Sequence, residues 1–160
     1  MSGIQRRASI EVCAVTGHRH IKEAKREYVR QQLQGAIWQA VNDGYTWFVS
    51  GFADGVDLMF AGIVADIKEK DPSIILEAAI PYRDRLEEKD PLFMELLKQC
   101  DYVYVVREEY SPDCYLARNT YLVENAERVI AVYDGRRRSG TAQTIRIARE
   151  HGREVNIIMT

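Results

Sequence analysis

The sequence predicts an α/β fold: a Rossmann-like three-layer sandwich in which helices cover both faces of a mostly parallel sheet of about six strands. Three observations carry this prediction. Short β-rich runs alternate with longer stretches of helical periodicity, which is the pattern of repeated βαβ units. The first run, residues 10–16, is apolar almost throughout, as a strand covered on both faces must be. Glycine-containing turns follow several of the runs.

The amino-terminal part of the chain predicts two strand–helix pairs. The strand at residues 10–16 leads into a helix over residues 24–42, where apolar side chains recur at helical spacing and Gly44 provides a stop. A second strand at residues 47–50 precedes a helix over residues 54–69. One face of that helix carries an apolar stripe, made of Val56, Phe60, Ile63, Val64 and Ile67.

The middle of the chain predicts a third strand at residues 73–80, ending at Pro81. A more polar helix follows over residues 87–99, with Pro91 inside its first turns, where proline is tolerated. A fourth strand is expected at residues 101–106, because aromatic and β-branched residues dominate this run.

The carboxyl-terminal part continues the alternation. A Ser-Pro-Asp turn precedes a helix over residues 115–125. A fifth strand at residues 128–133, a helix over residues 141–151 and a sixth strand at residues 154–159 complete the pattern, and Gly152 separates the last two. The chain contains no internal repeat, low-complexity tract or linker, so residues 1–160 are expected to form one domain.

The composition restricts the class of protein. Apolar residues make up 46% and charged residues 29% of the 160 residues, which is typical of a soluble globular protein. No apolar stretch approaches the ~20 residues that span a bilayer, and residues 1–7 lack the apolar core of a signal peptide. A cytoplasmic protein without a membrane contact is therefore expected. The formal charge of -2 disfavours nucleic acid as a partner.

The three cysteines are far apart in the sequence and form no CxxC pair. This pattern favours reduced thiols over a disulfide framework or a zinc site. Cys13 lies inside an apolar run and is expected to pack in the core.

Three turns carry the candidate chemistry, because ligands of open parallel sheets bind at the carboxyl ends of the strands. Glycines let the backbone turn sharply, and the N–H groups that begin the next helix attract anions. We therefore predict one phosphate-binding cleft formed by all three turns. Its residues are Thr16, Gly17, His18 and Arg19 after the first strand, Ser50, Gly51, Gly55, Val56 and Asp57 after the second, and Ser139, Gly140 and Thr141 after the fifth.

Several charged side chains beside these turns have two interpretations. Arg19 offers a planar fork to a phosphate or is solvated in its loop. Asp57 is the candidate catalytic acid or a group that binds a ribose hydroxyl; alternatively, it only stabilises the first turn of a helix. Asp54 is best explained as a helix N-cap. Arg118 and Asn119 form a polar pair that reaches the cleft from its far side or lies on the surface.

The remaining candidates are histidines, arginines and tyrosines. His18 and His20 form an HxH pair without acidic or cysteine ligands at suitable spacing, so a loop hydrogen bond is expected and a metal site is not. Residues 136–138 form a basic run, and such runs are usually solvated. The position of this run beside Gly140 allows one arginine to guide an anion into the cleft. Several tyrosines offer faces for a base to stack on or occupy half-buried edges, where tyrosines are equally common: Tyr82, Tyr110, Tyr115 and Tyr121.

These motifs together resemble a known family. TGHR at 16–19, SGFADGVD at 50–57, RN at 118–119, VIAVYDG at 129–135 and SGTAQT at 139–144 resemble the YpsA-like branch of the SLOG superfamily. Its relatives include LOG phosphoribohydrolases, molybdenum cofactor carrier proteins and DprA. The resemblance implies a Rossmann-like sheet whose glycine turns hold a nucleotide or a nucleotide-derived ligand, such as NAD, ADP-ribose or a nucleoside monophosphate.

The LOG hydrolases carry a PGGxGTxxE motif whose glutamate serves cleavage of an N-glycosidic bond. In this chain Thr144 stands at the matching position, and threonine cannot supply a negative charge. The resemblance therefore favours binding or sensing of a nucleotide, with no other cofactor expected. The alternative is a nucleotide N-glycosidase in which Asp57 or Glu124 supplies the acid. A DprA-like binder of single-stranded DNA is disfavoured by the charge. Open sheets of this kind often bury a helix face against a second copy, so a homo-oligomer is expected.

Overall fold

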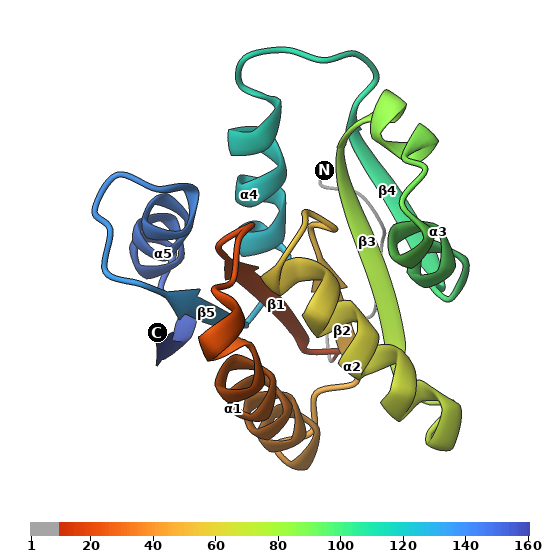
Figure 1. Cartoon of the computed structure of the whole chain (residues 1–160), viewed down its shortest axis with the longest axis vertical. Helices are drawn as coiled ribbons and strands as arrows, with labels where there is room; N and C mark the ends of the chain where they lie inside the picture. The colour runs from red at the N-terminus through yellow and green to blue at the C-terminus, as the bar shows by residue number, and fades with distance from the viewer. Residues whose placement is uncertain (1–9) are drawn as a thin grey trace.

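Strands and helices alternate along the chain, as a Rossmann-like fold requires (Figure 1). The computed structural model describes residues 10–160, so the segment 1–7, on which the expectation of no signal peptide rests, lies outside it. The elements in order are β1 (Val12–Gly17), α1 (Glu23–Asn42), β2 (Trp47–Ser50), α2 (Val56–Lys70), β3 (Ile75–Tyr82), the 3₁₀ helix η1 (Arg83–Glu87), α3 (Pro91–Lys98), β4 (Tyr102–Arg107), α4 (Cys114–Glu124), β5 (Arg128–Tyr133), α5 (Gly140–Glu150) and β6 (Glu154–Met159).

The six strands form one sheet in the order β4-β3-β2-β1-β5-β6, and every neighbouring pair is parallel. The predicted α/β class is confirmed, and the sheet is parallel throughout. The chain runs outward from β1 to β4, then returns to place β5 on the other side of β1. The connections after β1 and β5 therefore leave the sheet in opposite directions, which creates a switch point between these two strands.

Helices cover both faces of the sheet. α1, α2 and α3 pack on one face, where Leu33, Phe60 and Phe93 belong to a single apolar cluster. α4 and α5 lie beside each other on the opposite face (Figure 1), where Leu122 and Ala148 belong to a second cluster. Successive β1 residues alternate between the two: Cys13 and Val15 join the first cluster, Val12 and Ala14 the second. The expected core position of Cys13 is confirmed.

Some predicted boundaries were wrong. β3 continues through Pro81 to Tyr82. The helix expected over residues 87–99 begins only at Pro91, as α3, and the separate 3₁₀ helix η1 precedes it. Pro91 is the first residue of α3 rather than an interior one. It follows Asp90, whose carboxylate accepts a hydrogen bond from the Phe93 N–H at 3.1 Å. This combination of an aspartate cap and a proline without an N–H is a favourable way to begin a helix.

The expected N-cap at Asp54 was also wrong. α2 begins at Val56, and the residue before it, Gly55, has a φ of 82° and no side chain to cap the helix. The backbone here adopts a conformation that glycine tolerates and most residues do not. The start of α2 is consequently displaced from Asp54.

At the amino ends of the strands, a buried arginine ties several elements together. Arg128, the first residue of β5, pairs with Asp43 at 2.8 Å and with Glu154 at 2.7 Å. Its guanidinium also lies over the Tyr45 ring, 4.6 Å from the centroid. This cluster joins the end of α1, the approach to β2, and the starts of β5 and β6.

Candidate functional site at the switch point of the sheet

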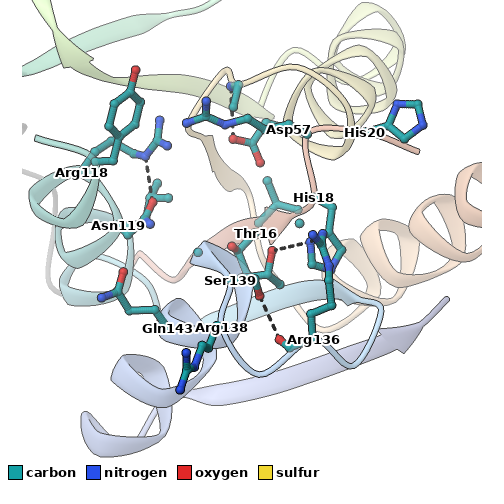
Figure 2. A pocket seen from close by; sticks show the side chains of 18 residues that line it. Thr16, His18, His20, Asp57, Arg118, Asn119, Arg136, Arg138, Ser139 and Gln143 are labelled. Atoms are coloured by element: carbon teal, nitrogen blue, oxygen red, sulfur yellow. Dashed lines mark hydrogen bonds between the residues drawn. The ribbon is translucent and has the colours of Figure 1, made fainter. Parts of the chain in front are cut away.

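A cavity of about 450 Å³ opens where β1 and β5 end. Its walls come from the turn after β1, the start of α2, the helix α4 and the turn before α5. Figure 2 shows Arg118 and Asn119 on one side of this cavity and His18 on the other. The volume lies within the range of small-molecule sites, roughly 300–1,000 Å³. No helix within residues 10–160 is both long and apolar enough to cross a membrane.

The structure brings most of the predicted site residues together around this cavity. Those that line it are Thr16, Gly17, His18, Arg19, Asp57, Arg118, Asn119, Ser139, Gly140 and Thr141. Tyr115, Arg136 and Arg138, which the sequence singled out more weakly, also line it. Ser50, Gly51, Gly55 and Val56 do not.

The polar groups of the turn after β2 are used within the protein. The Ser50 hydroxyl donates to the Asp57 carbonyl at 2.8 Å and accepts from the Phe52 N–H at 3.2 Å. The Gly51 carbonyl accepts a hydrogen bond from Arg118 Nη1 at 2.6 Å. These bonds hold the turn in place and remove its donors from the cavity.

The start of α2 is similarly occupied, because the turn after β1 packs directly on it. The Val56 N–H donates to the His18 carbonyl at 3.2 Å. A Cβ on Gly55 would lie 2.5 Å from the carbonyl oxygens of His18 and Arg19. Gly55 is therefore required for the contact between two turns of the chain. The predicted ligand contacts at Gly51, Gly55 and Val56 are not placed on this cavity.

The start of α5, in contrast, opens into the cavity. Ser139 is its N-cap and accepts a hydrogen bond from the Ala142 N–H at 3.1 Å. The N–H groups of Gly140 and Thr141 have no intrahelical acceptor, as at every helix start. Space is open beside Gly140, since an added Cβ would meet nothing within 4 Å. These amides and the helix dipole favour an anion at this end of the cavity.

Thr144, at the position of the LOG glutamate, points back along its own helix. Its hydroxyl donates to the Gly140 carbonyl at 2.9 Å, and the residue is fully buried outside the cavity lining. Glu124, the other alternative acid, lines a different hollow near β4. Of the two carboxyl groups proposed as the acid of a glycosidase, that of Asp57 borders the cavity.

Asp57 is buried at the cavity wall, and its protonation is unusual. Burial raises the pKa of its carboxyl to about 6, although Arg118, the Ala53 N–H and Arg19 each lower that pKa. The Ala53 N–H donates to Asp57 Oδ2 at 3.2 Å. A carboxyl group with such a pKa can exchange its proton near neutral pH, as an acid or base catalyst must.

Arg118 is 5% exposed and holds two parts of the site together. Besides its bond to Gly51, its Nε donates to Asn119 Oδ1 at 2.9 Å. Its Cζ lies 5.9 Å from the centroid of the Tyr115 ring, and the Cζ of Arg19 lies 4.9 Å from the same centroid. Burial lowers the pKa of Arg118 and Asp57 raises it. Arginine stays charged through such shifts, so the cavity wall carries a buried cation.

His18 forms the loop hydrogen bonds that the sequence predicted. Its Nε2 lies 3.0 Å from the Asp134 N–H and 3.1 Å from Asp134 Oδ1, while its Nδ1 lies 2.9 Å from Arg136 Nη2. Burial lowers the pKa of His18, Asp134 raises it and Arg136 lowers it. His20 lies apart from His18 (Figure 2), and no group of three metal-binding side chains gathers within residues 10–160.

Sequence reasoning missed Ala53, Leu122 and Gln143, which also line the cavity. Gln143 lies three residues after Gly140 on α5, so helical spacing could have placed it on the same side. No comparable signal marked Ala53 or Leu122.

Comparisons with known proteins agree with this architecture. The family model YpsA, described as the YspA SLOG family, matches residues 13–159. A UPF0398 protein of Bacillus pumilus (strain SAFR-032) is 25% identical over 138 residues, covering 78% of this chain and 74% of its own. A UPF0398 protein of Bacillus thuringiensis (strain Al Hakam) is 23% identical over 156 residues, covering 89% and 85%.

Two solved structures are similar in fold. The X-ray structure of TM1055 gives a TM-score of 0.62 at 18% identity, over 91% of this chain and 72% of that one. The Chlamydomonas rheinhardtii Moco carrier protein gives 0.55 at 12% identity, over 94% and 78%. Such identities support a common fold alone. Since the family model extends from β1 to β6, the chain belongs to the YpsA family of SLOG proteins.

Proposed function

We propose that this protein binds or senses a nucleotide or nucleotide-derived ligand, of the NAD, ADP-ribose or nucleoside monophosphate type, in the cavity at the switch point. The observation that carries the proposal is the open start of α5 in a cavity lined by Arg19, Arg118, Arg136 and Arg138. Family membership and the ligands implied by the SLOG resemblance support the same class.

In this proposal a phosphate group binds the N–H groups of Gly140 and Thr141. Arg138, in the same turn, supplies positive charge beside it, whereas Arg136 is paired with Asp134 at 2.7 Å. The nucleoside part extends toward α4, where Asn119 offers an amide and Tyr115 a ring. Asp57, on the wall between these ends, accepts a hydrogen bond from a ribose hydroxyl.

Titration calorimetry with NAD, ADP-ribose, AMP and related nucleotides tests the proposal. We expect saturable binding of at least one ligand, weakened about tenfold or more in Gly140→Val because the side chain fills the phosphate position. Gly35→Val is the matched control, since Gly35 is an exposed residue of α1 away from the cavity. Absence of binding to the whole panel, or equal affinity of the two variants, would contradict the proposal.

The raised pKa of Asp57 favours a second candidate, a nucleotide N-glycosidase. A carboxyl group that titrates near 6 at the wall of a nucleotide cavity can act as acid or base in cleaving an N-glycosidic bond. Chromatography of nucleoside monophosphates incubated with the protein would then reveal the free base. Asp57→Asn should abolish that release but retain ligand binding. If the unmodified protein releases no base between about pH 5 and about pH 8, the enzyme candidate fails and the binding proposal stands.

A further inference from the structure

A smaller hollow of about 120 Å³ adjoins the main cavity. The two share four lining residues: Arg19, Ala53, Tyr115 and Arg118. The hollow lies where β2 and β3 end, because Gly51 follows β2 and Arg85 belongs to η1 directly after β3. It is thus the next position along the carboxyl edge of the sheet, on the side of β1 away from α5.

Positive charge dominates this hollow. Arg19, Arg85 and Arg118 line it, against the single carboxylate of Asp54. Within residues 10–160 none of the three guanidinium groups forms an ion pair with a carboxylate. Arg83, which lies in η1 with Arg85, does form an ion pair, with Glu108 at 2.7 Å.

Aromatic rings, not carboxylates, hold two of these cations. The Cζ of Arg19 lies 4.9 Å from the centroid of Tyr115, and the Cζ of Arg85 lies 5.6 Å from the centroid of Phe93. A ring face orients a guanidinium group without neutralising its charge. The hydrogen-bond donors of both groups remain available to a ligand.

Arg118 adds a donor on the border of the two spaces. Its Nε and Nη1 bond to Asn119 and Gly51, whereas its Nη2 has no acceptor among the described residues. Only 5% of this residue is exposed. Across the described part of the chain, Arg128 Nε is the one buried side-chain nitrogen or oxygen without a hydrogen bond, so Arg118 Nη2 is open to solvent and can bond a ligand. Three arginines around the hollow favour an anionic ligand.

We infer that this hollow is a second anion subsite, which takes a further phosphoryl group of the ligand whose first phosphate lies at the start of α5. The inference rests on the proposed function and specifies it. The preferred ligand is then a nucleotide with phosphates at two separated positions, of the nucleoside bisphosphate class, whose nucleoside part passes Tyr115.

The test compares AMP with adenosine 3′,5′-bisphosphate by titration calorimetry. We expect the bisphosphate to bind about tenfold or more tightly than AMP. Arg85→Gln should remove this preference without changing the affinity for AMP, because Arg85 lines the hollow and not the main cavity. Arg85→Lys should restore part of the preference, since it restores the charge.

Arg83→Gln is the matched control, because Arg83 lies two residues away in η1 and lines neither space. It should keep the full preference for the bisphosphate. If AMP binds but the bisphosphate binds no more tightly, or if the preference survives Arg85→Gln, the second subsite is wrong and the proposed function stands. If neither nucleotide binds, and no other nucleotide of the panel binds, the proposed function fails as well.

Discussion

The space beside the Gly51 Cα is filled by side chains from two other elements. An added Cβ would lie 2.6 Å from Arg118 Nη1 and 2.9 Å from Asp57 Oδ2. Glycine at this position therefore lets a guanidinium and a carboxyl group approach the same turn. The geometry of the cavity wall depends on a residue that does not line the cavity.

Replacing Gly51 should disturb Arg118 more than the fold. In Gly51→Ala, Arg118 must move because its Nη1 occupies the place of the new methyl group. We expect nucleotide affinity to fall about tenfold, and the free energy of unfolding to fall by about 1–3 kcal/mol, as for other overpacked sites. Calorimetry and urea unfolding measure the two effects. Gly35→Ala, where an added Cβ has open space, should leave affinity unchanged. Unchanged affinity in Gly51→Ala would contradict this role.

Asp57 should make the protein less stable as the pH rises. Its folded-state pKa of about 6 exceeds the ordinary value of 3.8, so the folded protein binds more protons than the unfolded chain between these values. Stability from this group is thus complete below about pH 4 and declines up to about pH 6, by on the order of 3 kcal/mol.

Urea unfolding of the wild type and Asp57→Asn at several pH values measures this effect. The difference between the two proteins should change from about pH 4 to about pH 6 and stay constant above about pH 7. The comparison cancels Asp43, Asp71 and Asp134, whose pKa values are lowered and which act at lower pH. A difference that does not depend on pH would contradict the raised pKa.

The sequence predicted which residues lie at the cavity better than it predicted the contacts that these residues make. Thr16 to Arg19, Asp57 and Ser139 to Thr141 could be placed at the cavity because each follows a parallel strand. The bond from Arg118 to the Gly51 carbonyl joins residues 67 positions apart, and no local pattern records it. Glycines that serve contacts between turns look the same in the sequence as glycines that approach a ligand.

At the scale of elements, the starts of α2 and α5 differ although both follow glycine-containing turns. The first N–H of α2 is bonded to the His18 carbonyl, whereas Gly140 begins α5 with open space beside it. The difference arises because the turn after β1 packs on α2. Of these two helix starts, only that of α5 therefore has backbone N–H groups open to an anion.

Two N-caps provide a matched test of that difference. Ser139→Ala and Asp90→Ala each remove a side-chain acceptor from a helix start, at α5 and α3 respectively. Each should lower the free energy of unfolding by about 1 kcal/mol. Only Ser139→Ala should weaken nucleotide binding, because Ser139 lines the cavity and Asp90 does not. Urea unfolding and calorimetry measure both. Equal losses of affinity would argue against α5 as the phosphate site.

The element boundaries show what periodicity can and cannot predict. The predicted strands at residues 47–50, 128–133 and 154–159 coincide with β2, β5 and β6. Turn residues on both sides of each β-rich run mark where the strand begins and ends. The start of α2 was misplaced, because Gly55 has a positive φ and packs against the carbonyls of His18 and Arg19, which are distant in the sequence. Such long-range contacts decide where a helix begins.

At the scale of the whole molecule, the two sheet edges are β4 and β6. Tyr102 of β4 is 42% exposed on the face that α4 covers, where Tyr104 and Val106 pack against the second cluster, and Leu116 of α4 is also exposed. An apolar edge of this kind is suited to contact with a second copy of the chain. The expected homo-oligomer remains a prediction, and β4 with α4 is the surface that we propose for it.

Sedimentation analysis tests this surface. Leu116→Lys should lower the mass of the assembled protein to that of one chain, because a charged side chain on exposed Leu116 opposes burial of this surface. Met159→Lys places the same charge on the exposed Met159 of β6 and should leave the mass unchanged. Circular dichroism should be the same for both variants. A single-chain mass for the unmodified protein at high concentration would contradict the prediction.

The ion pairs of Arg128 and the cavity at the switch point lie at opposite ends of the same strands. One end joins α1, β5 and β6 through ion pairs, and the other carries the turns that line the cavity. Exposed side chains that line the cavity, such as Arg138, can therefore be exchanged for new specificity while the opposite anchor stays intact. In this fold, stability and ligand specificity can therefore be altered by substitutions at different ends of the sheet.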